Sequence, residues 1–228
     1  NIVDAEVAVY AKKHLLKEGI RVITGTKADA IMGNDHVTGV KTSAGLLRCE
    51  LLIMAAGIRP NTDFLQDSGL EMFKGTILVD KTMKTNLEDV YAAGDCVMVT
   101  NRITGKPQWS PMGSSANLEG RTLAQVLTGT KKEYPGVLGT GVVKLPNLNI
   151  GRTGLTEEQA KNAGYDVVTV VAPTDDKAHY YPDAGFFITK LIADRESHKL
   201  LGVQVLGNGA VDKMVDIAVM GINMGAVL

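Results

Sequence analysis

A glycine, an aspartate and a cysteine follow one another in the stretch LEDVYAAGDCVMV (87–99). The apolar pattern predicts a strand over 89–95 that ends in Gly94 and Asp95. A carboxylate at a strand end can accept hydrogen bonds from the hydroxyls of a ligand, or it can cap a turn through its own backbone. Cys96 has no histidine nearby and no second cysteine at CxxC spacing, so a buried, unreactive thiol is the simpler interpretation.

Small residues end a second apolar run, in MAAGIRPN (54–61). The continuous run over 51–57 predicts a strand that is buried on both faces and lies in a parallel sheet. Gly57 and the alanines before it would let a ligand approach the backbone at the carboxyl end of that strand, where open α/β sheets bind nucleotides. A plain exit from a strand into a loop explains the same residues.

A third stretch, PMGSSANLEGR (111–121), leads from small residues into a predicted helix over 115–127. Ser114 or Ser115 can act as its N-cap. The backbone N–H groups around Ser115 and Ala116 and the positive end of the helix dipole would suit an anion or an electron-rich acceptor. An ordinary capped helix also fits this pattern.

Polar aromatic residues cluster in HYYPDAG (179–185). If Tyr180 and Tyr181 lie on a strand, they point to opposite faces. One ring would then join the core, while the other could present its hydroxyl to a substrate or a partner. Packing with a single hydrogen bond accounts for the pair equally well.

Composition excludes several classes of function. The net charge is −1 and no basic cluster is present, which argues against nucleic-acid binding. No apolar run approaches the ~20 residues of a membrane span. The two cysteines form no CxxC pair, which favours a reducing, cytoplasmic setting. The four histidines share no metal-ligand spacing, so no metal site is expected. Both ends of the sequence suggest a fragment of a longer protein.

The remaining elements divide the chain into two halves. The first half predicts a helix over 4–18 and strands over 20–24, 28–32, 37–42 and 75–80, followed by a loop over 101–109 and a linker over 128–136. In the second half, Thr156 and Gln159 form a capping box at the start of a helix, and another helix begins near Asp212. Predicted strands over 140–145, 149–154, 166–173, 185–194 and 200–207 complete an α+β unit with an antiparallel sheet.

Taken in order, AAGIRPNT, GTILVD, TNLEDVYAAGDC, GSSANLEGR and the α+β tail resemble the pyridine nucleotide-disulfide oxidoreductases. The resemblance is strongest to the branch of NADH oxidases, NADH peroxidases and coenzyme A-disulfide reductases. It implies an α/β plus α+β fold, in which a partial FAD/NAD(P)-binding three-layer domain precedes an α+β dimerisation domain. The implied boundaries are 1–82 for the partial NAD(P)-binding domain, 83–135 for the returning FAD-binding segment and 136–228 for the dimerisation domain of a homodimer.

The same resemblance implies roles for the site residues. Asp95, after Gly94, would hold the ribityl chain of FAD, with the Cys96 backbone close to the cofactor. Ala116, at the start of its helix beside Ser115, would place its N–H near the pyrimidine edge of the flavin.

The resemblance also assigns residues outside the flavin edge. Gly57 would line the path of the nicotinamide. Tyr180 would enter the substrate pocket of the partner subunit, although Tyr181 is an alternative match.

The implied activity is electron transfer from NAD(P)H through FAD to a disulfide, a peroxide or oxygen. No catalytic residue is assigned in this chain, because the redox cysteine and both glycine fingerprints of the family would lie upstream. The chain alone is therefore expected to be inactive and to hold FAD poorly. A non-catalytic dimerisation module that acts through 136–228 and a flavoprotein of the glutathione-reductase type are the alternatives.

Overall fold

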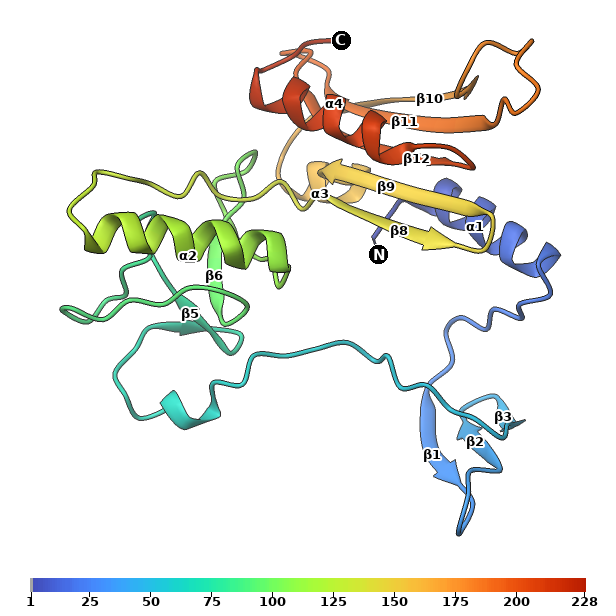
Figure 1. Ribbon diagram of the computed structural model, residues 1–228, viewed down its shortest axis with the longest axis horizontal. Helices are drawn as coiled ribbons and strands as arrows, with labels where there is room; N and C mark the ends of the chain where they lie inside the picture. The colour runs from blue at the N-terminus through green and yellow to red at the C-terminus, as the bar shows by residue number, and fades with distance from the viewer. Residues whose placement is uncertain (1) are drawn as a thin grey trace. The chain divides into compact units, whose positions relative to one another are not determined.

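The computed structural model describes residues 2–228, which fall into two compact units (Figure 1). The smaller unit comprises residues 12–59, and the larger comprises residues up to 11 together with 60–228. Helix α1 (Ala5–Lys17) contributes to both units. Its bounds confirm the predicted helix, and Gly19 follows it with a positive φ of 79°.

The smaller unit contains a three-stranded antiparallel sheet in the order β1-β2-β3. Strands β1 (Ala28–Met32) and β2 (Gly39–Thr42) confirm two predicted strands. Strand β3 (Gly45–Arg48) was not predicted; it pairs with β2, with Gly39 opposite Arg48. The strand predicted over 20–24 is absent from the described chain.

The predicted buried strand over 51–57 is wrong for the described residues. This run carries no strand assignment, and Ile53 and Met54 are 78% and 75% exposed. A parallel strand is stable only when neighbouring strands accept and donate its backbone hydrogen bonds. Within residues 2–228 no strand pairs with it, so an apolar sequence alone does not make it a strand.

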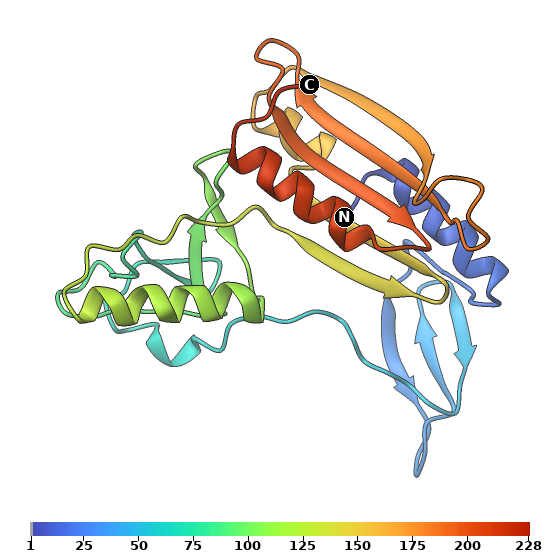
Figure 2. The same cartoon turned by 45° about the horizontal axis from the view of Figure 1, so that its top comes forward.

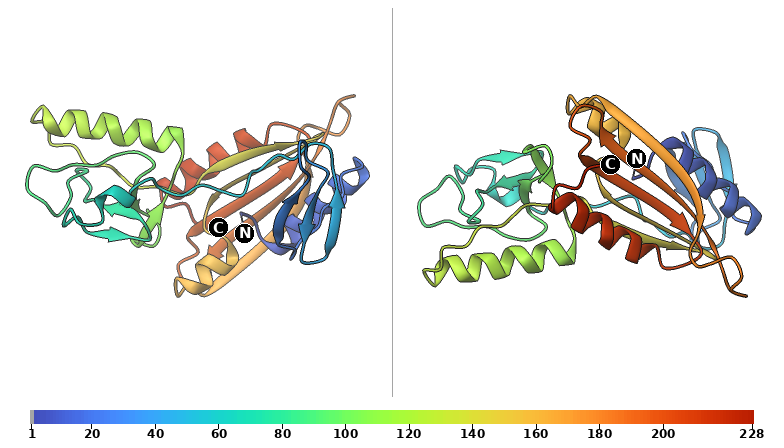
Figure 3. Two further views of the ribbon diagram at one scale, coloured as in Figure 1. Left: turned by 90° about the horizontal axis from the view of Figure 1, so that it is seen from below. Right: turned by 90° about the horizontal axis from the view of Figure 1, so that it is seen from above.

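The first part of the larger unit builds a four-stranded sheet in the order β4-β5-β6-β7. Its strands are β4 (Met72–Phe73), β5 (Thr76–Leu78), β6 (Val97–Thr100) and β7 (Pro107–Trp109), with a short 3-10 helix η1 (Asp63–Leu65) before them. Strands β5 and β6 are parallel, with Ile77 opposite Val97. Helix α2 (Gly113–Leu127) lies along this part of the chain (Figure 3). The buried core of this part of the larger unit comprises Ile77, Met83, Val97, Val99, Tyr134 and Val137.

The strand predicted over 89–95 is also wrong. A single bridge between Lys84 and Tyr91 is the only ladder contact of that stretch among the described residues. The positive φ values of Asp89 (58°) and Gly94 (93°) are incompatible with an extended run, and the strand begins instead at Val97. Gly94 and Asp95 therefore precede strand β6 rather than end a strand.

The second part of the larger unit is a five-stranded antiparallel sheet in the order β10-β11-β12-β9-β8. The strands are β8 (Gly141–Leu145), β9 (Leu148–Gly154), β10 (Val167–Asp175), β11 (Phe186–Asp194) and β12 (Leu200–Gly207). They confirm the predicted antiparallel sheet. Helix α4 (Val211–Asn223) packs along β12 and β9 (Figure 2). None of the helices within residues 2–228 is long and apolar enough to cross a bilayer.

Helix α3 (Glu157–Asn162) confirms the predicted capping box. The Thr156 hydroxyl accepts a hydrogen bond from the Gln159 N–H at 3.1 Å, and the Gln159 side chain accepts one from the Thr156 N–H at 3.0 Å. This reciprocal pair satisfies two N–H groups that the helix itself leaves without partners.

The beginning of α1 is anchored on the C-terminal sheet by a buried charge network. Asp4 accepts a hydrogen bond from the Gln204 side chain at 2.6 Å and one from the Glu157 N–H at 3.1 Å. The Lys190 ammonium, which is 0% exposed, lies 3.0 Å from Asp4, 2.5 Å from Glu6 and 2.7 Å from Glu157. Apart from the Lys190–Glu157 contact, these bonds connect residues that are more than 150 positions apart in the sequence.

Candidate functional site

Gly94 and Asp95 form a turn, here called the 94–95 turn, that lies against helix α2. The Gly94 N–H donates to Glu119 Oε2 at 2.7 Å. A Cβ added at Gly94 would lie 3.9 Å from the Ala116 Cβ, so the two residues are in van der Waals range. The structure thus brings together the 94–95 turn and the beginning of α2.

Asp95 itself is exposed, and its backbone is held in place from a third element. The Trp109 indole N–H, on strand β7, donates to the Asp95 carbonyl at 2.7 Å. The backbone around Asp95 is therefore fixed on both sides, by Trp109 and by Glu119, while its carboxylate faces solvent.

The N-terminus of α2 differs from the predicted one. The helix begins at Gly113, with Met112 at the N-cap in an extended conformation and no side-chain cap. Ser114 and Ser115 are not the N-cap, because both lie inside the first turn. The buried Ser115 hydroxyl instead pairs with the Ser110 hydroxyl at 2.9 Å.

The hydrogen-bond donors at this end of α2 can be identified. The Ala116 N–H already donates to the Met112 carbonyl at 2.9 Å. The N–H groups of the residues before Ala116 in the first turn have no partner within the helix itself. Without a side-chain cap, this end can donate hydrogen bonds to an electron-rich group.

Glu119 is the site residue that sequence reasoning missed. Its side chain is 1% exposed, one helical turn after Ala116 on the same side of α2. Burial raises the pKa of the Glu119 carboxyl above its ordinary value of 4.5; the Gly94 N–H opposes this shift and the Asp95 charge adds to it. The spacing of Glu119 from Ala116 in ANLEGR was the available signal, but the acceptor role depends on Gly94, 25 residues earlier.

Cys96 and Tyr134 border the same buried carboxylate. Burial raises the pKa of the Cys96 thiol; a backbone hydrogen bond opposes this shift, and the charges of Glu119 and Asp95 add to it. Burial likewise raises the pKa of Tyr134, with Glu119 as the next contributor. A thiol with a raised pKa is a poor nucleophile, which agrees with the unreactive Cys96 that the sequence favours.

Replacing Glu119 with glutamine is expected to stabilise the protein in a pH-dependent way. A raised folded-state pKa means that the folded protein holds the proton more tightly than the unfolded chain does. Its free energy of unfolding therefore falls as the pH rises from 4.5 through the folded-state pKa. Glu119→Gln removes this loss, so its melting temperature should exceed that of wild type by a margin that widens from pH 4.5 to pH 7. Calorimetry at several pH values, with the exposed Glu133→Gln as control, tests this; a margin that does not change with pH would contradict it.

The other predicted site residues lie elsewhere. Gly57 belongs to the smaller unit, where it is exposed and has a φ of 101°. Tyr180 and Tyr181 lie on the loop between β10 and β11, not on a strand, so their predicted opposite orientation is wrong. Their rings stack at 5.2 Å, and both are exposed. An ion pair between Lys177 and Asp183 spans this loop.

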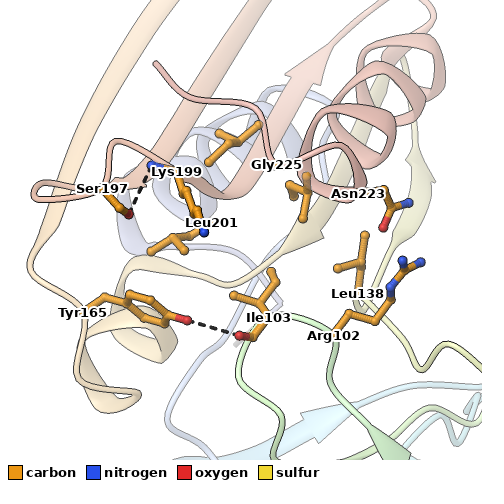
Figure 4. Close-up of a pocket in the computed structure, with 11 residues that line it drawn as sticks. Arg102, Ile103, Leu138, Tyr165, Ser197, Lys199, Leu201, Asn223 and Gly225 are labelled. Atoms are coloured by element: carbon orange, nitrogen blue, oxygen red, sulfur yellow. Dashed lines mark hydrogen bonds between the residues drawn. The ribbon is translucent and has the colours of Figure 1, made fainter.

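A separate cavity of about 400 Å³ lies between the loop after β6 and the end of α4 (Figure 4). One wall is closed by the Tyr165 hydroxyl, which donates to the Ile103 carbonyl at 3.1 Å. Arg102 and Lys199 are exposed at its edges. The cavity contains neither the 94–95 turn nor the start of α2. Within residues 2–228 no group of three or more His, Cys, Asp or Glu side chains could hold a metal ion.

Two family models match most of the chain. The model described as pyridine nucleotide-disulphide oxidoreductase matches residues 1–116. A second model, described as the dimerisation domain of the pyridine nucleotide-disulphide oxidoreductases, matches residues 141–228.

Curated relatives and solved structures extend the match. The NAD(P)H sulfur oxidoreductase (CoA-dependent) of Pyrococcus furiosus is 37% identical over 193 residues, which cover 84% of this chain and 44% of the relative. The NADH oxidase of Methanocaldococcus jannaschii is 33% identical over 213 residues, 93% of this chain and 47% of the relative. The NAD-dependent persulfide reductase from A. fulgidus has a TM-score of 0.93 and 36% identity, over 99% of this chain and 42% of that structure. The chain therefore spans less than half the length of these relatives.

Proposed function

This chain belongs to the pyridine nucleotide-disulphide oxidoreductase family, and from that premise we propose that the full-length protein transfers electrons from NAD(P)H through FAD to a disulfide, a peroxide or oxygen. The named relatives act on sulfur compounds or are NADH oxidases. The observation in this chain that supports the proposal best is the 94–95 turn, which is held against the uncapped N-terminus of α2.

The residues at this edge fit a flavin nucleotide. Gly94 carries no side chain where the turn meets Ala116, so a ligand can approach the backbone closely. The exposed Asp95 carboxylate can accept hydrogen bonds from the hydroxyls of a ribityl chain. The uncapped N–H groups of α2 can donate to the carbonyl edge of the ring system.

Each of these groups orients the cofactor or stabilises charge on it. When bound, FAD supplies the hydride acceptor and passes electrons onward. Negative charge on its pyrimidine edge would be stabilised by the positive end of the α2 dipole, by about 0.3–1 kcal/mol. The Ala116 N–H already donates to the Met112 carbonyl, so it does not serve as a donor to the flavin. The role left for Ala116 is to keep the space beside Gly94 open with a small side chain. The Cys96 backbone follows directly after Asp95, while its thiol stays protonated and unreactive.

We assign the remaining predicted residues by analogy with the family. Gly57 would line the nicotinamide path, and Tyr180 or Tyr181 would reach the substrate pocket of a second subunit. The boundaries 1–82, 83–135 and 136–228 are proposed for the three domains. The two free cysteines support a reducing, cytoplasmic setting.

Absorption spectroscopy tests the proposed function. The full-length protein should be yellow as purified, with its visible flavin absorption band bleached when NADH or NADPH is added without oxygen. Sulfur, peroxide and oxygen acceptors can then be compared by the rate at which each restores the band. A colourless full-length protein that does not react with either nicotinamide would contradict the proposal.

We also propose that a second copy of the protein covers an apolar face of α4. Ile217, Met220 and Met224 are 66%, 61% and 78% exposed and lie about one helical turn apart. An exposed apolar stripe of this kind marks an interaction surface. Its position within the part matched by the dimerisation model favours a homodimer.

Charged substitutions on this face are expected to separate the subunits. The double variant Ile217→Glu/Met220→Glu places two carboxylates in the proposed interface, where unpaired charges are strongly unfavourable. We expect light scattering to show monomers at concentrations where wild type is a dimer. Asp212→Lys changes the charge by two units at an exposed position of the same helix that lies away from the stripe of Ile217, Met220 and Met224, and it serves as the matched control. An unchanged dimer in the double variant would exclude this face.

A further inference from the structure

We infer that Glu119 is a positioning residue of the flavin site, because its side chain holds the 94–95 turn against helix α2. The inference rests on the proposed function of this edge. Glu119 does not touch the cofactor in this assignment; it acts through Gly94 and, one residue further, through Asp95.

The Gly94 N–H needs a hydrogen-bond acceptor. The turn precedes β6, which begins at Val97, so the N–H of Gly94 lies outside the strand ladder. A backbone N–H away from water is almost always paired, since an unpaired one is costly. The Glu119 carboxylate meets this need at 2.7 Å from the opposite element.

Glu119 is buried, which is unusual for a glutamate. A carboxylate that is 1% exposed is disfavoured unless it is hydrogen-bonded. Ser115 and Thr122 are also buried on α2, which places Glu119 on the side of the helix that faces the protein interior. Its place on that side, and its bond to Gly94, bring the turn to the beginning of the helix.

The bond between Gly94 and Glu119 also links the two groups that are proposed to hold the ligand. The exposed Asp95 follows Gly94 directly, and Ala116 lies one turn before Glu119. Loss of the Glu119 bond would remove the hydrogen bond that ties the turn to α2. The bonds from the Trp109 indole to the Asp95 carbonyl and from the Val97 N–H to the Gly94 carbonyl would remain, and neither comes from α2. The carboxylate and the helix N-terminus would then no longer be held at a fixed separation.

An electrostatic role is the competing explanation, because Glu119 faces several titratable groups. Asp95 approaches from the turn, Cys96 from the residue after it, and Tyr134 from the segment after α2. Two substitutions separate the effect of side-chain length from the effect of charge. Glu119→Gln keeps the length and an acceptor oxygen but removes the charge, whereas Glu119→Asp keeps the charge but shortens the side chain by one methylene.

The test is the dissociation constant of FAD, measured by fluorescence titration of the flavin-stripped full-length protein. We expect E119Q to bind FAD within about twofold of wild type. We expect E119D to bind at least about tenfold more weakly, as for a lost hydrogen bond to a charged acceptor. Glu119→Met is a second test that keeps the side-chain volume, removes the acceptor and removes a buried charge; it should weaken FAD binding as E119D does. Glu133→Asp, on the surface, is the control.

Hydrogen exchange of the Gly94 amide gives a readout that does not need the flavin. We expect this amide to exchange at least tenfold faster in E119D and E119M than in wild type. FAD binding unchanged in E119D and E119M, or weakened equally in E119Q, would overturn the positioning role while the proposed function stands. A wild-type protein with no affinity for FAD would instead overturn the proposed function itself.

Discussion

Replacing Lys190 with methionine is expected to lower the free energy of unfolding by about 3–5 kcal/mol, the usual cost of removing one partner from a buried ion pair. The Lys190 ammonium is fully buried and contacts the carboxylates of Asp4, Glu6 and Glu157. Without it, the carboxylates of Asp4 and Glu6 lose this cation, and Glu157 keeps its ion pair with Lys161. The beginning of α1 would then lose its strongest attachment to the C-terminal sheet.

The pKa values of these groups indicate the pH range in which the network stabilises the fold. Burial alone would lower the pKa of Lys190, but hydrogen bonds to Glu157, Glu6 and Asp4 outweigh it and raise the pKa above the ordinary 10.5. A raised lysine pKa contributes stability that is fully present at neutral pH. Hydrogen bonds from Lys161 and Lys190 lower the pKa of Glu157. The contribution of Glu157 to the free energy of unfolding is therefore present above pH 4.5 and is lost as the pH falls through the folded-state pKa.

Denaturant unfolding of wild type and of Lys190→Met at pH 7 measures the effect. The matched control is Lys81→Met, which removes the exposed ion pair of Lys81 with Glu133 at 3.6 Å. Exposed pairs contribute only about 0–1 kcal/mol, so this variant should unfold almost as wild type does. Equal, small losses in both variants would contradict a stabilising network around Lys190.

Lys190 also shows why part of the fold could not be predicted from the sequence. Its carboxylate partners Asp4, Glu6 and Glu157 lie 186, 184 and 33 positions away, and no local pattern links them. The capping box of Thr156 and Gln159 was predictable because both residues lie within one turn of one helix.

The two wrong strands have separate physical causes. The run over 51–57 has the composition of a buried strand but no neighbouring strand within the described chain, and pairing decides whether such a run is a strand. The stretch over 89–95 contains left-handed residues at Asp89 and Gly94, whose conformations are set by the turn. Apolar content indicated a strand in both places, and tertiary context overrode it.

The candidate site was predicted only in part, because one of its contacts joins residues that are far apart in the sequence. The proximity of Gly94 and Ala116 follows from an order of motifs along the chain that resembles a known family. The role of Glu119 depends on a contact across 25 residues, which no spacing rule would reveal. The N-cap of α2 was misplaced because two serines in the first turn suggested a cap that Met112 occupies.

Adding a single methyl group at Gly154 is expected to destabilise the C-terminal sheet by about 3 kcal/mol. Gly154 ends β9 with a φ of 73° and lies opposite Gly202 of β12. An alanine there would adopt a left-handed conformation, which costs about 1–3 kcal/mol. Its Cβ would also lie 2.2 Å from the Leu201 carbonyl oxygen, so the backbone would have to move, at a further cost of about 1–3 kcal/mol.

The control for Gly154→Ala is the same substitution in a helix of the same domain. Gly221 lies inside α4 with a negative φ, and a Cβ there would meet only Ala226 and Leu200 side chains, at 3.5 and 3.6 Å. Gly221→Ala is expected to stabilise α4 by up to about 1 kcal/mol, because alanine loses less backbone entropy in a helix. If thermal unfolding shows a loss of stability in Gly154→Ala and a gain in Gly221→Ala, the loss is due to the conformation of Gly154 and its close backbone contact. A loss of similar size in both variants would instead indicate that any added methyl group disturbs this domain.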